Sequence, residues 1–265
     1  MMLNHKTALV FGGGGAIGGA AARAFAREGA RVFLAGRTAS KLDAVAGDIR
    51  AAGGAADTAV LDVFDADAVH ALVDAVAAET GGIDIAMVAV GFVHVQGTPF
   101  LDLTLADFVH PVDAYLRALF VTTQAVARPM AKAGSGVILT LSTPGSRLTW
   151  PGFLGYGIAC AAKESFSRRL AVELGPHNIR VVCLMPNAVP EAIARGSHAR
   201  EVFAPLAARE GLTVEEMLAQ PQDMPALRRF PTLEEVAEAA VFAASPRGGA
   251  ITGAVMNLSC GLVTD

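Results

Sequence analysis

Glycines cluster directly after the first apolar run of the chain. Four of them, at positions 12–15, follow Thr7–Phe11, and two more stand at positions 18 and 19, where a helical pattern begins. Glycine lets the backbone turn sharply beside a pyrophosphate, whose charge the N-terminus of the next helix meets. A merely flexible turn would not explain why the cluster follows the first strand. We expect the phosphates of a dinucleotide to bind at Gly12, Gly14, Gly15, Ile17 and Gly18.

The second apolar run ends at Gly36 and Arg37. A site for NAD usually has an Asp or Glu here, which binds the adenosine ribose hydroxyls. Gly36 has no such side chain, whereas the planar cation of Arg37 suits the ribose 2′-phosphate of NADP. A surface arginine near Asp43 is the alternative. The pattern favours NADP(H) over NAD(H).

Asp62 and Val63 follow the third apolar run and are expected near the adenine. The Asp62 carboxylate has two interpretations. It accepts a hydrogen bond from the adenine amino group, or it caps the helix that follows.

Seven short apolar runs are predicted to be strands, and Ala-rich amphipathic stretches lie between the earlier ones. Successive residues in these runs, which point to opposite faces of a strand, are mostly apolar, as expected for strands covered on both faces. Strand alternating with helix predicts an α/β fold with a doubly wound parallel sheet of the Rossmann type. The expected strands are Thr7–Phe11, Arg31–Ala35, Thr58–Leu61, Ile85–Val90, Val137–Leu141, Val181–Leu184 and Ala254–Leu258. The expected helices include Ala20–Glu28, Ser40–Ala52, Asp67–Glu79 and Leu116–Ala131.

No linker or repeat divides the chain, so residues 1–265 are predicted to form a single domain. Thr104 with Asp107 and Thr232 with Glu235 have the spacing of a helix start. Residues 190–230, rich in proline and charge, are too long for a plain connection. We expect them to form a partly helical lid or substrate-binding segment.

Composition narrows the classes of function. The net charge is −4 and no cluster of Lys and Arg occurs, which argues against nucleic acid as a partner. Three scattered cysteines predict neither a disulfide framework nor a metal site, and they fit a reduced, cytoplasmic setting. No signal peptide and no apolar run of membrane-spanning length is expected.

Together with the glycine turn, six further stretches of the sequence resemble the short-chain dehydrogenase/reductase family, from Lys6 to Leu262. The stretches are Ile83–Gly91, Gly136–Thr143, Tyr156–Leu174, Ile179–Val189, Arg229–Ala244 and Ile251–Gly261. The resemblance implies about seven strands, a nicotinamide cofactor contacting Gly91 as well, and a homodimer or homotetramer.

The resemblance also implies a catalytic group, of which only part is present. The proton donor or acceptor of the family matches Tyr156, and the hydroxyl thirteen residues earlier is that of Thr143, with Ser142 beside it. The family's lysine falls on Cys160 and its asparagine on Tyr115. A phenol with an ordinary pKa of about 10 is a poor proton shuttle at neutral pH without a nearby cation.

Other residues offer replacements. Lys163 lies on nearly the same helix face as Tyr156, about 10.5 Å along the axis, but a subunit contact or solvent is the favoured environment for it. Tyr115 is a new acid or base, a pocket wall, or simple packing. His94 and Trp150 fall on loops at strand ends; we expect a surface imidazole and an apolar wall, respectively. Glu191 stands near the position where, in the family that the sequence resembles, a threonine commonly holds the carboxamide of the cofactor.

Two functions follow from these expectations. The first is an NADP(H)-dependent oxidoreductase that acts on the carbonyl or alcohol of a small hydrophobic organic substrate. The second is a cofactor-binding protein without ordinary redox turnover, favoured by the joint loss at Cys160 and Tyr115.

Overall fold

Seven parallel strands form one sheet in the computed structural model, which describes residues 1–220 and 223–264. The strand order is β3-β2-β1-β4-β5-β6-β7. This confirms the predicted Rossmann-type α/β fold. The strands are β1 (Thr7–Phe11), β2 (Arg31–Gly36), β3 (Ala55–Val60), β4 (Ile85–Val88), β5 (Gly136–Leu141), β6 (Ile179–Pro186) and β7 (Val255–Leu258).

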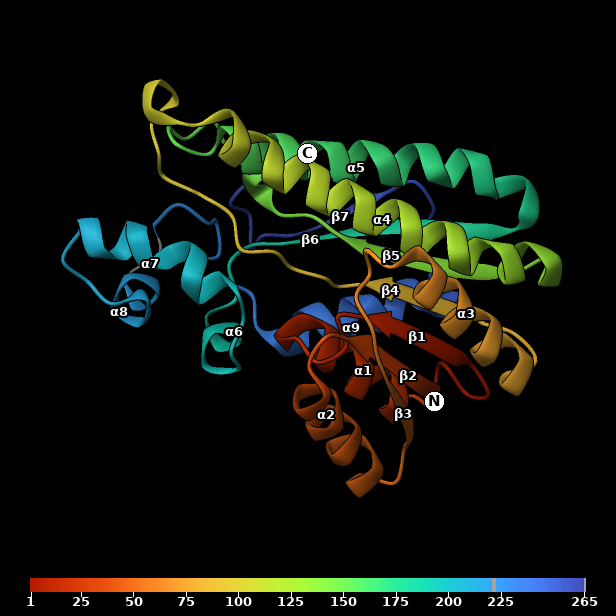
Figure 1. Ribbon diagram of the computed structural model, residues 1–265. Coiled ribbons are helices and arrows are strands. Elements are labelled where there is room, and N and C mark those ends of the chain that lie inside the picture. Colours follow the sequence, from red (N-terminus) through yellow and green to blue (C-terminus); the bar gives the residue numbers. More distant parts are fainter. Residues whose placement is uncertain (221–222, 265) are drawn as a thin grey trace.

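Helices cover both faces of this sheet (Figure 1). The helices are α1 (Ala16–Arg27), α2 (Ala39–Ala51), α3 (Ala66–Thr80), α4 (Leu105–Ala133), α5 (Leu154–Leu174), α6 (Pro190–Ala194), α7 (Ala199–Arg209), α8 (Val214–Ala219) and α9 (Leu233–Ala244). The apolar sides of α1, α2 and α9 pack on one face, and those of α3, α4 and α5 pack on the other. The central strands are buried from both sides, as their continuous apolar runs require.

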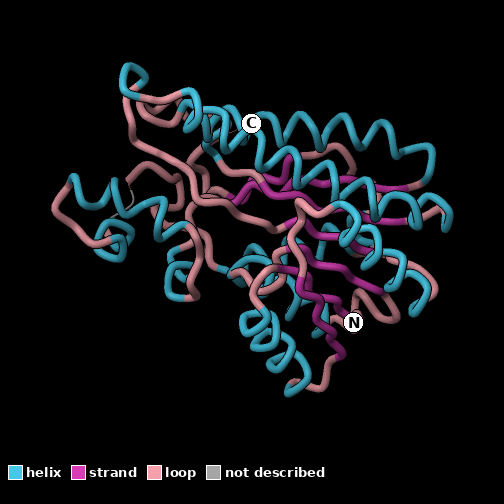
Figure 2. The backbone as a smooth tube through the Cα atoms, viewed as in Figure 1, coloured by secondary structure: helices cyan, strands magenta, loops and turns pink. Residues whose placement is uncertain are grey.

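The strand order reverses between β1 and β4. Parallel sheets of this kind bind ligands in the crevice at such a reversal, outside the carboxyl ends of the strands. The tube in Figure 2 shows the strands running side by side, with long loops gathered at one end of the sheet. The fold thus brings together the segments that follow β1, β2, β4, β5 and β6.

The predicted helix starts are present. The Thr104 hydroxyl accepts a hydrogen bond from the amide of Asp107, and Thr232 and Glu235 cap each other at α9. The segment 190–230 contains α6, α7 and α8, which lie together beyond one end of the sheet (Figure 1); its residues 221 and 222 lie outside the described part of the chain. No helix among the described residues is long and apolar enough to cross a membrane.

Candidate active site and cofactor cleft

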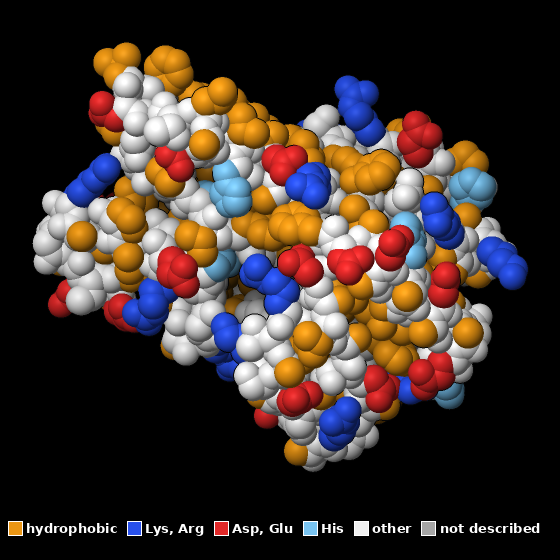
Figure 3. Space-filling model, in the orientation of Figure 1, with side chains coloured by type: hydrophobic (Ala, Val, Ile, Leu, Met, Phe, Trp, Pro, Cys, Tyr) orange, Lys and Arg blue, Asp and Glu red, His pale blue; other side chains and the backbone are white. Residues whose placement is uncertain are grey.

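A cavity of about 580 Å³ lies at the carboxyl ends of the strands. Its wall includes Gly12 after β1, Arg37 after β2, Gly91 after β4, Thr143 after β5 and Asn187 after β6. The space-filling view shows a hollow between the α6–α8 part and the body of the molecule, with basic and histidine side chains beside it (Figure 3).

The glycine turn leaves no room for side chains. Gly12 has a φ of +79°, and a Cβ there would lie 2.5 Å from the Ala89 carbonyl oxygen. A Cβ at Gly18 would lie 2.3 Å from the Gly12 oxygen, so Gly18 allows α1 to pack against the turn. The cavity is lined by Gly12, Gly14, Gly15 and Ile17. Because the glycines carry no side chains at the turn and lead into the N-terminus of α1, a pyrophosphate can come close to the backbone there.

Two cations stand at the β2 end of the cavity. Arg37 is exposed and lines it, as does Lys41 in the first turn of α2. The Lys41 ammonium donates a hydrogen bond to the Gly196 carbonyl, 3.2 Å away, and so links α2 to the segment after α6. Lys41 was not predicted as a site residue, although its place at the start of the expected helix after Arg37 was a usable signal.

Asp62 and Val63 also line the cavity. The Asp62 carboxylate accepts a hydrogen bond from the Phe64 amide at 3.0 Å, whereas α3 is capped by Asp65. The idea that Asp62 caps that helix is therefore wrong. Gly91 borders the cavity too, but the His198 imidazole covers it: a Cβ on Gly91 would lie 2.1 Å from the His198 Cε1.

Asn187 has an unpaired donor at the cavity. Its side-chain oxygen accepts a hydrogen bond from the Ala188 amide, and its buried Nδ2 has no partner within the described structure. Such an amide fits a cofactor group that offers an acceptor. Glu191 instead accepts a hydrogen bond from the Leu233 amide at the start of α9, 2.9 Å away, and does not line the cavity.

The Tyr156 and Thr143 hydroxyls meet at the cavity wall. The Thr143 hydroxyl donates to the Tyr156 oxygen at 3.3 Å and also lies 3.3 Å from the Cys160 sulfur. Thr143 follows the end of β5 and Tyr156 lies in the first turn of α5, so these two elements position the pair of hydroxyls. Cys160 is fully buried one turn later.

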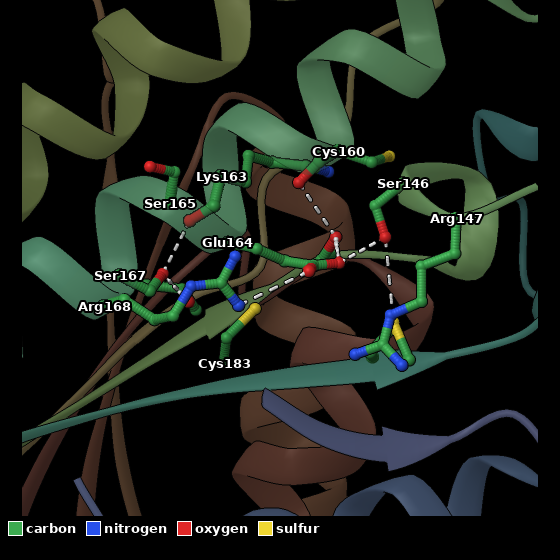
Figure 4. A network of polar contacts seen from close by, with 12 residues as sticks. Ser146, Arg147, Cys160, Lys163, Glu164, Ser165, Ser167, Arg168 and Cys183 are labelled. Atoms are coloured by element: carbon green, nitrogen blue, oxygen red, sulfur yellow. Dashed lines mark hydrogen bonds and ion pairs between the residues drawn. The ribbon is translucent and has the colours of Figure 1, made fainter. Parts of the chain in front are cut away.

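Ser142 belongs to a different polar network. Its buried hydroxyl lies 3.1 Å from a Glu164 carboxylate oxygen, which also accepts a hydrogen bond from Ser146. Figure 4 shows Glu164 between Ser146 and Arg168, whose guanidinium is 3.7 Å from the carboxylate. This network ties the start of the β5–α5 connection to α5. It leaves Thr143, rather than Ser142, beside Tyr156.

His94 is not the expected surface imidazole. It is 7% exposed and stacks on Tyr156, with ring centroids 4.2 Å apart and planes 16° apart. Its Nδ1 lies 2.7 Å from the Phe92 carbonyl, and its Nε2 lies 2.8 Å from the Gln96 side-chain nitrogen. Because the carbonyl only accepts, Nδ1 carries the proton and Nε2 accepts from Gln96. The imidazole therefore fixes one side of the Tyr156 ring.

Lys163 is also not where its sequence position predicted. Its side chain is 4% exposed, so the expected position in solvent or at a subunit contact is wrong. The ammonium lies over the ring of Tyr115, 4.1 Å from the centroid, and 5.6 Å from the centroid of Tyr156. Tyr115 is 6% exposed, and its hydroxyl accepts a long hydrogen bond from the Phe92 amide at 3.4 Å.

Burial sets the protonation of these groups. It raises the pKa of Tyr156 well above the usual value, helped by Cys160 and Tyr115, while the Thr143 hydrogen bond acts in the opposite sense. Tyr156 therefore holds its proton at neutral pH and is a donor. Burial also lowers the pKa of both His94 and His198 to about 4, so these imidazoles are uncharged at neutral pH.

The remaining wall of the cavity is largely apolar. Trp150 lines it while 42% exposed and packs edge-on against Phe153, with centroids 5.6 Å apart. The helices of the 190–230 segment add further apolar side chains on the facing side: Val202, Phe203, Leu206, Met217 and Leu218. No group of three or more possible metal ligands occurs among the described residues.

Comparisons with known proteins agree with this arrangement. A family model described as enoyl-(acyl carrier protein) reductase matches residues 14–263. An uncharacterized oxidoreductase of Mycobacterium tuberculosis is 34% identical over 98% of this chain and 93% of its own length. The 3-oxoacyl-[acyl-carrier-protein] reductase FabG of Chlamydia muridarum is 30% identical, with 98% of each chain covered. A short-chain type dehydrogenase/reductase from Mycobacterium marinum superposes with a TM-score of 0.82, at 29% identity over 99% of this chain and 97% of the other. The chain belongs to the short-chain dehydrogenase/reductase family and is an oxidoreductase of that type.

Proposed function

We propose that this oxidoreductase uses NADP(H) to interconvert a carbonyl and an alcohol on a small hydrophobic organic substrate. The observation that carries the proposal is the Thr143–Tyr156 hydroxyl pair, 3.3 Å apart at a cavity that also contains the glycine turn. A bound nicotinamide supplies or accepts the hydride. Tyr156 exchanges the proton with the substrate oxygen, and Thr143 orients that oxygen.

The preference for NADP(H) is supported by the charges at the β2 end of the cavity. Arg37 and Lys41 both line it there, and no carboxylate replaces Gly36. A 2′-phosphate would thus meet a guanidinium and an ammonium. The free Nδ2 of Asn187 supports a cofactor contact at the opposite end.

The 190–230 segment is proposed to be the lid over the substrate. Among the contacts that join it to the body of the protein are those of Lys41 with the Gly196 carbonyl, Arg209 with the Gly97 carbonyl and Glu191 with the Leu233 amide. Its apolar side chains face the cavity, which supports a hydrophobic substrate.

We also propose a homodimer or homotetramer in a reducing, cytoplasmic setting. Exposed apolar side chains on α4 and α5 support self-association: Leu105, Val109, Phe120, Leu154, Ile158 and Val172. The three cysteines are unpaired, as expected in a reducing compartment.

The test of the reaction is NADPH consumption with a panel of alicyclic and aromatic ketones. We expect turnover that falls in Thr143→Val, which removes the hydroxyl at nearly constant volume. NADPH binding without consumption of any ketone, and without oxidation of the matching alcohols by NADP⁺, would contradict the proposed reaction and favour a cofactor-binding role.

A further inference from the structure

Lys163 brings a positive charge into a buried cluster of ionisable side chains. The cluster combines α4, α5, β6, the loop after β4 and the 190–230 segment. Its members around Lys163 are Tyr115, Tyr156, Cys160, Cys183, His94 and His198. Figure 4 shows the Lys163 side chain extending along α5 toward Cys160, on a different side from Glu164.

The Lys163 ammonium lacks the usual partner for a buried charge. No carboxylate in the described part of the chain lies within ion-pair distance of it. A buried charge without compensation is costly. The groups that can compensate it are phenols and thiols. Burial lowers the pKa of Lys163, but the attraction between the ammonium and the ionised forms of Cys160, Tyr115 and Cys183 outweighs this and raises the pKa.

Among the phenols, Tyr115 is closer. The ammonium is 4.1 Å from the Tyr115 ring centroid, against 5.6 Å for Tyr156. Burial raises the pKa of Tyr115 above its usual value, and the charge of Lys163 offsets part of that rise. For Tyr156 the main influences after burial are Cys160 and Tyr115. The local geometry explains the difference, because a lysine on α5 leans toward the helix N-terminus and here meets the face of α4 that carries Tyr115.

We propose that Tyr115 and Lys163 form an acid–base pair in this active site, in which the Lys163 ammonium stabilises the ionised form of Tyr115. Lys163 is then a positioning residue that acts through Tyr115. The role in turnover rests on the proposed carbonyl–alcohol reaction, whereas the pairing itself does not.

The proton balance of the pair is simple. In reduction, Tyr156 gives its proton to the substrate oxygen and is left as a phenolate. The O–H bond of Tyr115 then breaks, and its proton reaches the Tyr156 oxygen through an intervening water, because no hydrogen bond joins the two hydroxyls directly. Lys163 stabilises the charge left on Tyr115. Water returns a proton to Tyr115. No electron is transferred in these steps, and one proton is taken up from solvent.

The chain is suited to a direct test because Tyr115 and Tyr156 are its only tyrosines. Tyrosinate absorption therefore reports these two groups alone. In a Tyr156→Phe background, Tyr115 titrates by itself, and Lys163→Met should raise its midpoint by about one pH unit or more. Lys163→Arg should restore most of the shift. Lys132→Met, which removes an exposed lysine of α4, should leave the midpoint unchanged.

The reciprocal experiment uses Tyr115→Phe, in which Tyr156 alone titrates. Lys163→Met should raise that midpoint by less than it raises the Tyr115 midpoint. An equal or larger effect on Tyr156, or no effect on Tyr115, would overturn the pairing. The titrations need neither cofactor nor substrate, so they stand even if the proposed reaction is wrong. Should Lys163→Met fail to fold, Lys163→Gln and Lys163→Arg are compared with wild type in the same way.

Turnover supplies the second measurement. If Tyr115 exchanges a proton, the pH profile of kcat/KM loses one ionisation in Tyr115→Phe, and Lys163→Met moves the same ionisation to higher pH. A profile identical to wild type in both variants would remove Tyr115 from the reaction even if the pairing is found.

Discussion

Replacement of Arg37 by alanine tests the proposed cofactor preference. Arg37 is exposed at the β2 end of the cavity, where we propose that the 2′-phosphate of NADPH, which NADH lacks, is bound. The variant should therefore weaken NADPH binding and leave NADH binding nearly unchanged. Truncation at an exposed position removes no core packing, so the change isolates the charge.

The size of the effect follows from exposure. A hydrogen bond to a charged group contributes about 1.5–3 kcal/mol, and solvent screening at an exposed site favours the lower end. A loss of about 1.4 kcal/mol corresponds to about a tenfold weaker dissociation constant for NADPH. Lys41 stands beside the same site and retains part of the attraction. At high salt the difference between wild type and variant should shrink.

Fluorescence titration of both cofactors provides the assay. Arg128→Ala is the matched control, since Arg128 is an exposed arginine on α4. An equal loss for NADPH and NADH would show that Arg37 acts on the shape of the site rather than on the phosphate. Unchanged NADPH affinity would refute the assignment altogether.

Three further variants address catalysis and stability. Tyr156→Phe should lower kcat by about 100-fold or more, with NADPH affinity retained, because it removes only the proton donor. Cys160→Lys should raise the initial rate of ketone reduction and move its pH optimum toward neutral, because an ammonium beside Tyr156 favours the ionised form of that phenol. Glu235→Gln should lower the thermal midpoint at neutral pH by an amount equivalent to under about 1 kcal/mol, because the exposed carboxylate pairs with Arg229 and caps α9. These contacts lower the pKa of Glu235 to about 2, so the stabilisation is present above the ordinary carboxyl range and is lost as the pH falls toward 2, where variant and wild type should melt alike.

The sheet could be predicted because each strand carries its own apolar signal. β3 was expected from Thr58 but begins at Ala55, since Ala-Ala-Asp has little strand propensity and is held by pairing with Arg31–Phe33. The 190–230 segment was predicted to be partly helical, but its three short helices were not predicted individually. Thr213 and Glu216 form a capping box at α8 whose spacing is visible in the sequence.

The site also contains features that the local sequence predicts and features that depend on packing between distant segments. The glycine turn depends on backbone conformation, which neighbouring residues determine, so the sequence predicts it well. His94, Lys163 and His198 acquire their environments only through packing between distant segments. Sequence patterns indicated an exposed His94 and Lys163, because polar residues usually are exposed. The residues next to His94 and Lys163 in the sequence do not reveal that His94 stacks on the Tyr156 ring or that Lys163 lies over the Tyr115 ring.

Trp150 has a consequence for how this protein unfolds in the laboratory. It is the single tryptophan of the chain and stands at the cavity wall, packed against Phe153. Intrinsic emission therefore reports the mouth of the cavity, whereas far-ultraviolet circular dichroism reports the helices and the sheet. If the two signals change together on heating, the domain melts as one cooperative unit. If the emission changes first, the mouth opens as a local unit of lower stability while the Rossmann core is still intact.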